Sequence, residues 1–293
     1  MDPIELSHLT KRYGAHRGVE DLSLSVREGE IYGFIGPNGA GKSTTIRTLL
    51  GLIRPTSGGA RLFGLDCAAA GPQARRQVGY LPGEVFYYEN MRVGELLDYA
   101  AGFYPGDHSA RTRALAEYME LDLSRRIGEL SFGNKKKVGI VQGLQHGPRL
   151  LLLDEPTAGL DPLMQQRFFD LLREENRRGV TVFFSSHILS EVQRLCHRVA
   201  ILREGRLVEE QSMEALREQS CCRVRLSAEG AREERFRLPG VSDLTVRGSE
   251  VSFLYRGSPN ALTEGLRGVP MGSLWIEEPS LEEIFLHYYE GGE

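Results

Sequence analysis

The stretch GPNGAGKS, residues 36–43, matches the pattern G-x-x-x-x-G-K-[S/T] at every position. It follows a short apolar run, EIYGFIG (30–36), and precedes TTIRTLLGLI (44–53), so we expect a buried strand, a glycine-rich turn and a helix in that order. In such a turn the backbone N–H groups point at phosphate oxygens, and the helix N-terminus adds the positive end of its dipole. The predicted phosphate-binding residues are Gly36, Pro37, Asn38, Gly39, Ala40, Gly41, Lys42, Ser43 and Thr44.

A nucleoside triphosphate site also needs an acidic residue for its metal ion. The apolar run LLLLDEP (150–156) predicts a buried strand with Asp154 at its carboxyl end, where open α/β sheets bind ligands. We expect Lys42 to reach the β- and γ-phosphates, and Ser43 and Asp154 to hold Mg²⁺. Glu155 follows directly and is the candidate general base for the attacking water.

The rest of the chain has the pattern of an α/β protein. Residues 1–30 alternate apolar and polar side chains, which indicates antiparallel strands, and residues 85–145 are predicted to be mostly helical. The continuous apolar run VTVFFSSH (180–187) predicts a strand of a parallel sheet covered on both faces. From about residue 219 the pattern changes to that of a small α+β unit. We therefore predict two domains, at 1–218 and 219–293.

Composition restricts the classes of partner. The net charge is −4, so no nucleic-acid partner is expected. Four cysteines lack zinc-site spacing and are expected to be reduced thiols. The N-terminal stretch has no apolar signal region, and no apolar run approaches the roughly 20 residues that span a bilayer. We expect a cytoplasmic protein, and any role at a membrane would have to come through a partner.

GPNGAGKSTTIRTLLGLIRPTSG, LLLLDEPTAGLD and SSH, in this order, resemble an ATP-binding-cassette (ABC) ATPase over about residues 4–215. The resemblance implies a P-loop NTPase fold of the ABC type with antiparallel β and helical subdomains, the latter at about 85–145, and ATP and Mg²⁺ as ligands. It also implies that Tyr13 stacks on adenine, that His187 contacts the γ-phosphate as a catalytic residue, and that Asp161 lies in the loop that meets an opposing subunit.

LSFGN, residues 130–134, stands where this family carries its LSGGQ signature. Ser131 and Gly133 are kept, and Phe132 and Asn134 depart from the pattern. In the family the motif begins a helix and caps the γ-phosphate of ATP held by the other subunit, so a head-to-tail homodimer is implied. Three of the chain's five lysines follow at 135–137. They either support the anion site or form a solvated face.

A second departure lies in VGYLPGEVFYYENM (78–91), where the family's Gln after Leu-Pro is replaced by Gly83. Glu84 could take over its contact, or the contact is missing and turnover is slow. Phe86, Tyr87 and Tyr88 either meet a membrane subunit or pack within the helical subdomain. The ending EEPSLEEIFLHYY resembles the C-terminal extension of ABC-2-type exporter ATPases. Its matching residues are Pro279, Ser280, Leu281 and Phe285.

These features predict the ATP-hydrolysing subunit of an ABC exporter, which drives transport by separately encoded integral membrane permease subunits. The transported substrate would be selected by those subunits. Two alternatives remain at this point. One is a soluble ABC ATPase without a transport role, although the paired cassettes and zinc modules usual there are missing from this sequence. The other is a slow nucleotide-sensing regulatory module, favoured by Gly83 and Phe132 but not by Glu155.

Overall fold

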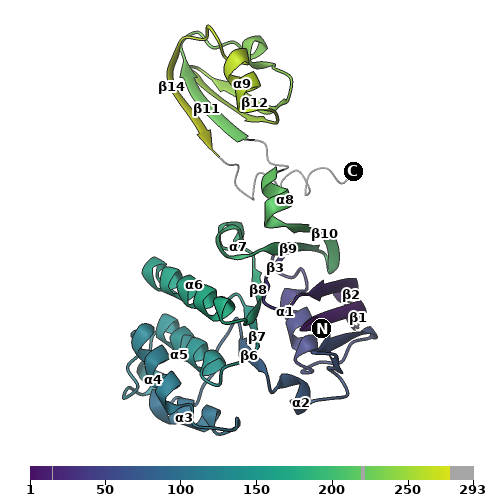
Figure 1. Cartoon of the computed structure of the whole chain (residues 1–293), viewed down its shortest axis with the longest axis vertical. Helices are drawn as coiled ribbons and strands as arrows, with labels where there is room; N and C mark the ends of the chain where they lie inside the picture. The colour runs from purple at the N-terminus through teal and green to yellow at the C-terminus, as the bar shows by residue number, and fades with distance from the viewer. Residues whose placement is uncertain (15, 219–221, 278–293) are drawn as a thin grey trace. The chain divides into compact units, whose positions relative to one another are not determined.

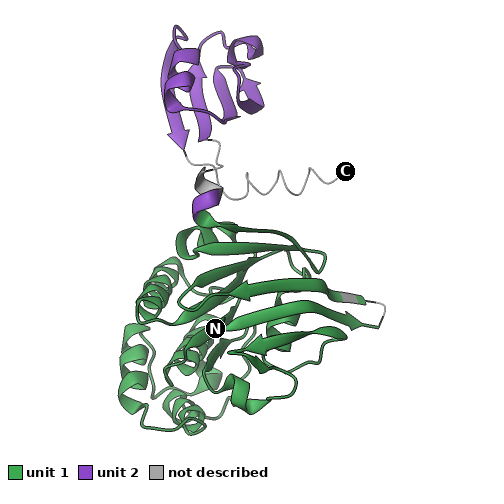
Figure 2. Cartoon of the chain, turned by 45° about the vertical axis from the view of Figure 1, so that its right-hand side comes forward, with its two compact units in different colours: residues 1–213 green, residues 214–293 purple. Residues whose placement is uncertain are grey.

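The computed structural model describes residues 1–14, 16–218 and 222–277. The chain divides into two compact units, Met1–Met213 and Glu214–Glu293 (Figure 2). The predicted boundary at 218/219 borders residues 219–221, which lie outside the described residues. The tail residues named above, Pro279, Ser280, Leu281 and Phe285, also lie outside them.

The first unit is built on a six-stranded sheet in the order β10-β9-β3-β8-β7-β6. Five of these strands run parallel, and only β10 pairs antiparallel to its neighbour. The strands are β3 (Ile31–Ile35), β6 (Val78–Leu81), β7 (Leu150–Asp154), β8 (Thr181–Ser186), β9 (Arg198–Arg203) and β10 (Arg206–Ser212). Every residue of β3, β7 and β8 is buried, which confirms the prediction of a parallel sheet covered on both faces.

The register of this sheet brings the carboxyl ends of four strands to one edge. Ile35 of β3 is opposite Ser186 of β8, and Asp154 of β7 is opposite Ser185 of β8. On the far side of β7, Leu81 of β6 is opposite Leu153. The loops that follow β3, β6, β7 and β8 therefore begin side by side, at the edge where α/β folds bind ligands.

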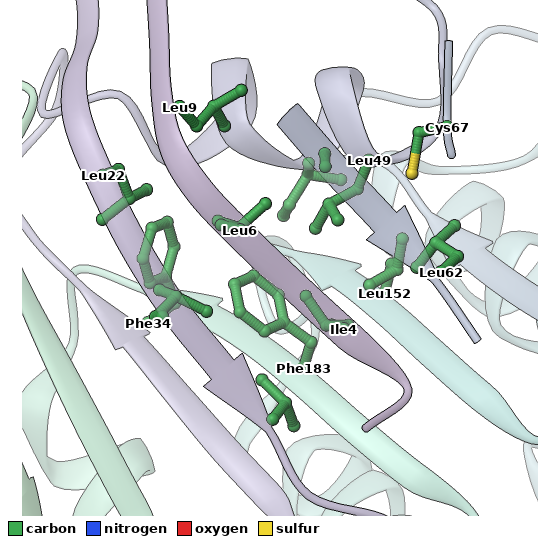
Figure 3. Close-up of a cluster of buried hydrophobic side chains, with 14 of the residues drawn as sticks. Ile4, Leu6, Leu9, Leu22, Phe34, Leu49, Leu62, Cys67, Leu152 and Phe183 are labelled. Atoms are coloured by element: carbon green, nitrogen blue, oxygen red, sulfur yellow. The ribbon is translucent and has the colours of Figure 1, made fainter. Parts of the chain in front are cut away.

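A four-stranded antiparallel sheet, in the order β2-β1-β4-β5, covers part of the parallel sheet. Its strands are β1 (Ile4–Tyr13), β2 (His16–Val26), β4 (Ser57–Leu62) and β5 (Leu65–Asp66). Leu6 and Leu22 of this sheet pack with Phe34 and Phe183 of the parallel sheet and with Leu49 of helix α1 (Figure 3). The antiparallel strands expected in residues 1–30 are thus confirmed, and one apolar core joins the two sheets.

Helices cover the remaining surfaces of the first unit. They are α1 (Lys42–Leu49), α2 (Pro72–Arg75), α3 (Val93–Ala101), α4 (Ser109–Tyr118), α5 (Phe132–Leu144), α6 (Pro162–Arg177) and α7 (Leu189–Leu195), with a short 3₁₀ turn at Ile127–Glu129. Helices α3, α4 and α5 gather on the side away from β1 and β2 (Figure 1). They form the helical subdomain expected at about 85–145.

The second unit begins at Glu214, the second residue of α8 (Met213–Glu218), and contains a sheet in the order β12-β13-β11-β14. Its elements are β11 (Cys222–Ala228), a 3₁₀ turn (Glu233–Phe236), β12 (Val241–Arg247), β13 (Glu250–Tyr255), α9 (Pro259–Gly265) and β14 (Met271–Glu277). A separate apolar cluster that includes Val224, Phe236, Phe253 and Leu262 forms its core. This is the α+β pattern that the sequence predicts.

No helix in the described ranges has both the length and the apolar character needed to cross a bilayer.

Candidate active site

The predicted phosphate loop lies between β3 and α1. Gly41 has a φ of +105°, and a Cβ there would lie 2.5 Å from the carbonyl oxygen of Gly18. At Gly36 a Cβ would lie 2.6 Å from the carbonyl oxygen of Leu202. Both positions therefore require glycine, one for its backbone conformation and both for the close approach of another strand or loop. The phosphate loop is therefore closely packed against β2 and β9, and α1 begins at Lys42, directly after Gly41.

Lys42 points back over this loop. Its side chain is 6% exposed, and its Nζ donates hydrogen bonds to the carbonyl oxygens of Gly36 at 2.6 Å and Pro37 at 3.2 Å. The same Nζ lies 3.2 Å from Oε1 of Glu155. The ammonium group is thus fixed above the loop, where it can meet a phosphate chain bound by the loop's N–H groups.

Glu155 joins the phosphate loop to the end of β8. Its Oε2 is 2.7 Å from Nδ1 of His187, while its Oε1 faces Lys42. The residue adopts a φ of +45°, a left-handed conformation that is uncommon outside glycine and that concentrates at functional sites. Lys42, Glu155 and His187, the three predicted catalytic residues, therefore form one connected group although 145 positions separate the first from the last.

Asp154 precedes Glu155 and is held by the neighbouring strand. Its carboxylate is almost completely buried, and Oδ1 accepts a hydrogen bond of 2.8 Å from the hydroxyl of Ser185. The backbone N–H of Glu155 donates to the carbonyl oxygen of Ser185 at 3.1 Å. Ser185 thus positions both acidic residues. Ser185 has no predicted role from sequence, and the only signal for it is its place opposite Asp154 in a parallel register.

Tyr13, the predicted adenine-stacking residue, ends β1 and is 44% exposed. A Cβ built on Gly18 would lie 3.0 Å from Cε2 of Tyr13 and 3.2 Å from Cγ2 of Thr44, so the ring lies close to the first turn of α1. Nζ of Lys11 lies 5.2 Å from the ring centroid. The tyrosine therefore offers an accessible ring close to the phosphate loop.

The residues of the signature motif form a second group. Ser131 caps α5, and its Oγ accepts a hydrogen bond of 3.4 Å from the N–H of Asn134. A Cβ on Gly133 would lie 2.4 Å from the carbonyl oxygen of Gly159, so the motif packs tightly against the loop after β7. At the end of that loop Asp161 caps α6, accepting a 3.0 Å hydrogen bond from the N–H of Met164.

In the described ranges, side-chain contacts do not join the group of Lys42, Glu155 and His187 to the residues of the signature motif. Among the described residues, no hydrogen bond or ion pair links the side chains of Ser131 or Asp161 to Lys42, Glu155 or His187. The half-exposed ring of Phe132 lies over Gly159 on the outer side of the motif. Ser131 and Asp161 are exposed, and Gly133 packs against the loop that ends at Asp161.

The three lysines after the motif have different environments. Lys136 is fully buried, and its Nζ donates hydrogen bonds to the carbonyl oxygens of Pro82 at 2.9 Å and Gly83 at 3.0 Å. Burial lowers the pKa of Lys136 to about 8, although the carboxylates of Asp154 and Glu155 act in the opposite direction. Lys137 is also buried. The interpretation of the three lysines as a solvated face is therefore wrong for Lys136 and Lys137.

Gly83 lies beside Asp154, one of the two predicted metal ligands. A Cβ there would be 3.6 Å from the carbonyl oxygen of Asp154 and 4.0 Å from its Oδ2, both ordinary contacts. Gly83 brings no side chain to this edge, and the neighbouring Glu84 is exposed. The turn after β6 therefore approaches Asp154 through its backbone.

Known proteins resemble this chain in sequence and in fold. The family model for ABC transporters matches residues 19–158. Over 99% of its length the chain is 35% identical to the bacitracin transport ATP-binding protein BcrA of Bacillus licheniformis, 98% of which is covered. It is also 35% identical to the Nod factor export ATP-binding protein I of Burkholderia orbicola, over 97% of this chain and 96% of that protein. A solved ATP-binding subunit of an ABC transporter is 33% identical, with a TM-score of 0.70 over 74% of this chain and 92% of that chain.

Proposed function

The chain belongs to the ABC transporter family, as its motifs predict, and on this premise we propose that it is the ATP-hydrolysing subunit of an exporter. The observation that carries the proposal is the connected group of Lys42, Glu155 and His187 at the carboxyl edge of the parallel sheet. Export as the driven process is supported by the relatives, one named for bacitracin transport and one for Nod factor export.

Hydrolysis follows from the positions of these side chains. ATP would lie with its phosphates on residues 36–44 and its adenine on Tyr13, with Lys42 neutralising charge on the β- and γ-phosphates. Glu155 would orient a water molecule and accept its proton as the water oxygen attacks the γ-phosphorus and the bond to ADP breaks. The hydrogen bond between His187 and Glu155 holds the carboxylate in this orientation, and His187 would also contact the γ-phosphate.

The donor set at the edge fits Mg²⁺. This ion prefers carboxylate and hydroxyl oxygens, and it usually takes only one or two protein groups together with phosphate oxygens. Asp154 uses Oδ1 for Ser185, and in the described part of the chain no hydrogen bond engages Oδ2. Ser43 and Asp154 would hold the ion, which supplies positive charge at the phosphates when bound.

Two copies of this chain would together form two complete ATP sites. The proposal of a partner-facing surface at Ser131, Gly133 and Asp161 is supported by the exposure of Ser131 and Asp161, and the N-terminus of α5 favours an anion. In a head-to-tail homodimer this surface would cap the γ-phosphate on the partner. Such an arrangement is isologous, which is the commonest symmetry of oligomers.

The permease would dock on a groove beside the helical subdomain. The groove measures about 540 Å³, and its lining includes Phe86, Tyr88, Tyr99 and Phe103. These four aromatic side chains are between 57% and 86% exposed, an apolar surface that suits a segment of an integral membrane subunit. The chain would then lie at the inner face of the cell membrane through that subunit.

A test of hydrolysis uses Lys42→Ala. The variant loses the only ammonium group within hydrogen-bonding distance of the loop carbonyls in the described residues, and ATPase activity should fall about 10²-fold or more. The measurement is phosphate release under saturating Mg-ATP. Near-normal release would overturn the phosphate-loop assignment.

A test of the transport role uses the Glu155→Gln chain, tagged and expressed in its native cell. Membranes are solubilised in mild detergent with Mg-ATP, and the copurifying proteins are identified. We expect a multi-spanning membrane protein in about equal amount, because two cassettes serve two permease subunits. Recovery of soluble partners alone would contradict the exporter and favour a soluble ABC ATPase.

A further inference from the structure

We propose that Lys136 is a positioning residue that ties the signature helix α5 to the turn after β6, and so couples the surface offered to a partner with this chain's own hydrolytic edge. The inference rests on the proposed function for its consequence in hydrolysis. Its structural basis, the contact of a buried ammonium group with two carbonyl oxygens, is independent of that function.

The contact joins parts of the chain that lie far apart in sequence. Lys136 stands 54 positions after Pro82 and 53 after Gly83, and its single Nζ donates to both carbonyl oxygens. A lysine is almost never fully buried unless its charge has partners, so an exposed fraction of 0% marks an unusual use of this residue type. The two carbonyl oxygens are the partners that the described residues provide.

One end of the tie is the turn after β6. Gly83 has no side chain, so at this position the turn approaches Asp154 through its backbone. Lys136 engages two successive carbonyl groups of the turn, which leaves the turn little freedom to move independently of α5. The positive charge of Lys136 also interacts favourably with the carboxylates of Asp154 and Glu155. A displacement of α5 would therefore change both the position of the turn and the electrostatics of the edge.

The other end of the tie is the N-terminus of α5. Ser131 caps this helix, and Gly133 packs in its first turn against Gly159. Lys136 follows within the next turn of the same helix, and a helix of 13 residues moves as one body over this short distance. When a partner's nucleotide closes on Ser131 and Gly133, α5 would be displaced. Lys136 would pass this displacement to the turn beside Asp154.

The test compares Lys136→Met with Lys135→Met. Methionine keeps the length and removes the charge and the donors. Lys135 is the matched control, because it lies on the same helix, is partly exposed, and faces the exposed Glu89 at 3.5 Å. For Lys136→Met we expect kcat to fall about tenfold or more, the KM for ATP to change by less than about threefold, and the Hill coefficient for ATP to fall toward one. Lys135→Met should keep all three values near those of the wild type.

Hydrogen exchange gives a readout that does not need hydrolysis. In Lys136→Met the backbone amides of residues 83–85 should exchange faster than in the wild type, while those of the β3–α1 loop do not change. Lys136→Gln keeps an amide donor on a shorter side chain, and it should lose less kcat and less protection than the methionine variant. It also keeps the test usable if the methionine variant does not fold.

The outcomes separate the two proposals. A wild-type chain that does not hydrolyse ATP contradicts the proposed function, yet faster exchange at 83–85 in Lys136→Met would still support the tie. Unchanged exchange at 83–85 overturns the tie. Changed exchange with kcat within about twofold of the wild type shows a contact that does not couple the sites. A parallel fall of kcat, ATP affinity and thermal midpoint would mean a packing role only.

Discussion

Glu155→Gln tests the centre of the site with the smallest change of shape. The substitution keeps the volume and one oxygen, and it removes the negative charge between Lys42 and His187. A positioned general base contributes about 10²- to 10⁴-fold to a rate. We therefore expect kcat to fall by this factor, which corresponds to about 3–5 kcal/mol in the barrier.

The same change should strengthen ATP binding. At 3.2 Å the Lys42–Glu155 pair has a Coulomb energy of about 5 kcal/mol at an effective dielectric of about 20, most of which is offset by solvation. ATP must compete with this carboxylate for Lys42 and is repelled by its charge. Removing the charge should lower the Kd for ATP about three- to tenfold, which is roughly 0.7–1.4 kcal/mol.

The assay combines phosphate release, equilibrium binding of ATP, and the mass of the particle in Mg-ATP. Slow turnover with tighter binding should leave a nucleotide-held dimer. The control is Asp170→Asn, which alters a half-exposed carboxylate on α6 paired with Arg173 and should leave all three readouts unchanged. A kcat within about tenfold of the wild type would refute Glu155 as the base. Weaker ATP binding would refute the electrostatic argument, and a strictly monomeric variant would refute the two-copy site.

Three further predictions concern packing, the unusual turn and pH. Gly133→Ala places a Cβ 2.4 Å from the carbonyl oxygen of Gly159, so stability should fall by about 1–3 kcal/mol in urea unfolding, whereas Gly59→Ala, with nothing within 4 Å, should be nearly neutral. An equal effect of the two would contradict the packing argument. Gly83→Gln meets no atom closer than 3.6 Å, and because the turn is already held by its backbone we expect ATPase activity to change by less than about threefold; a tenfold rise would show that the site lacks a side-chain ligand. Burial lowers the pKa of His146 to about 4, below the unfolded value of 6.5, so the unfolded chain binds more protons between these values. Its contribution to stability is complete above pH 6.5 and is lost as the pH falls toward 4, by at most about 1.4 kcal/mol per pH unit. Urea unfolding at pH 7.5 and 5.0 should therefore show a larger acid loss for the wild type than for His146→Gln, and equal losses would exclude this histidine.

The predicted catalytic residues illustrate what local pattern can supply. The phosphate loop could be predicted because its geometry is local: Lys42 binds carbonyl groups only five and six positions earlier, and the glycines stand where the turn needs them. The buried strand LLLLD and its terminal Asp154 could be predicted for the same reason, since burial of a strand is visible as a continuous apolar run. The assignment of His187 to the same site followed from family resemblance, because no periodicity encodes it, and its contact with Glu155 was not predicted.

The aromatic run after Gly83 shows where pattern is insufficient. The sequence left Phe86, Tyr87 and Tyr88 open between interface and packing, and the structure divides them. Phe86 is 86% exposed, whereas the hydroxyl of Tyr87 lies close to Gly139 of α5, and burial raises the pKa of Tyr87. In an irregular segment the direction of each side chain depends on the surface beneath it, here α5, which lies some 50 residues further along the chain.

The sequence by itself determined the family, the order of strand, loop and helix around the phosphates, and the identity of the acidic residues. Each of these is carried by a short motif whose residues lie within a few positions of one another. Only the tertiary structure decided that Glu155 faces both Lys42 and His187, that Ser185 holds Asp154, and that Lys136 is a buried tie rather than a solvated charge. The physical reason is common to all three. Each contact forms between segments that lie 31 to 113 positions apart, and the environment of a side chain is set by what packs against it, not by its neighbours in sequence.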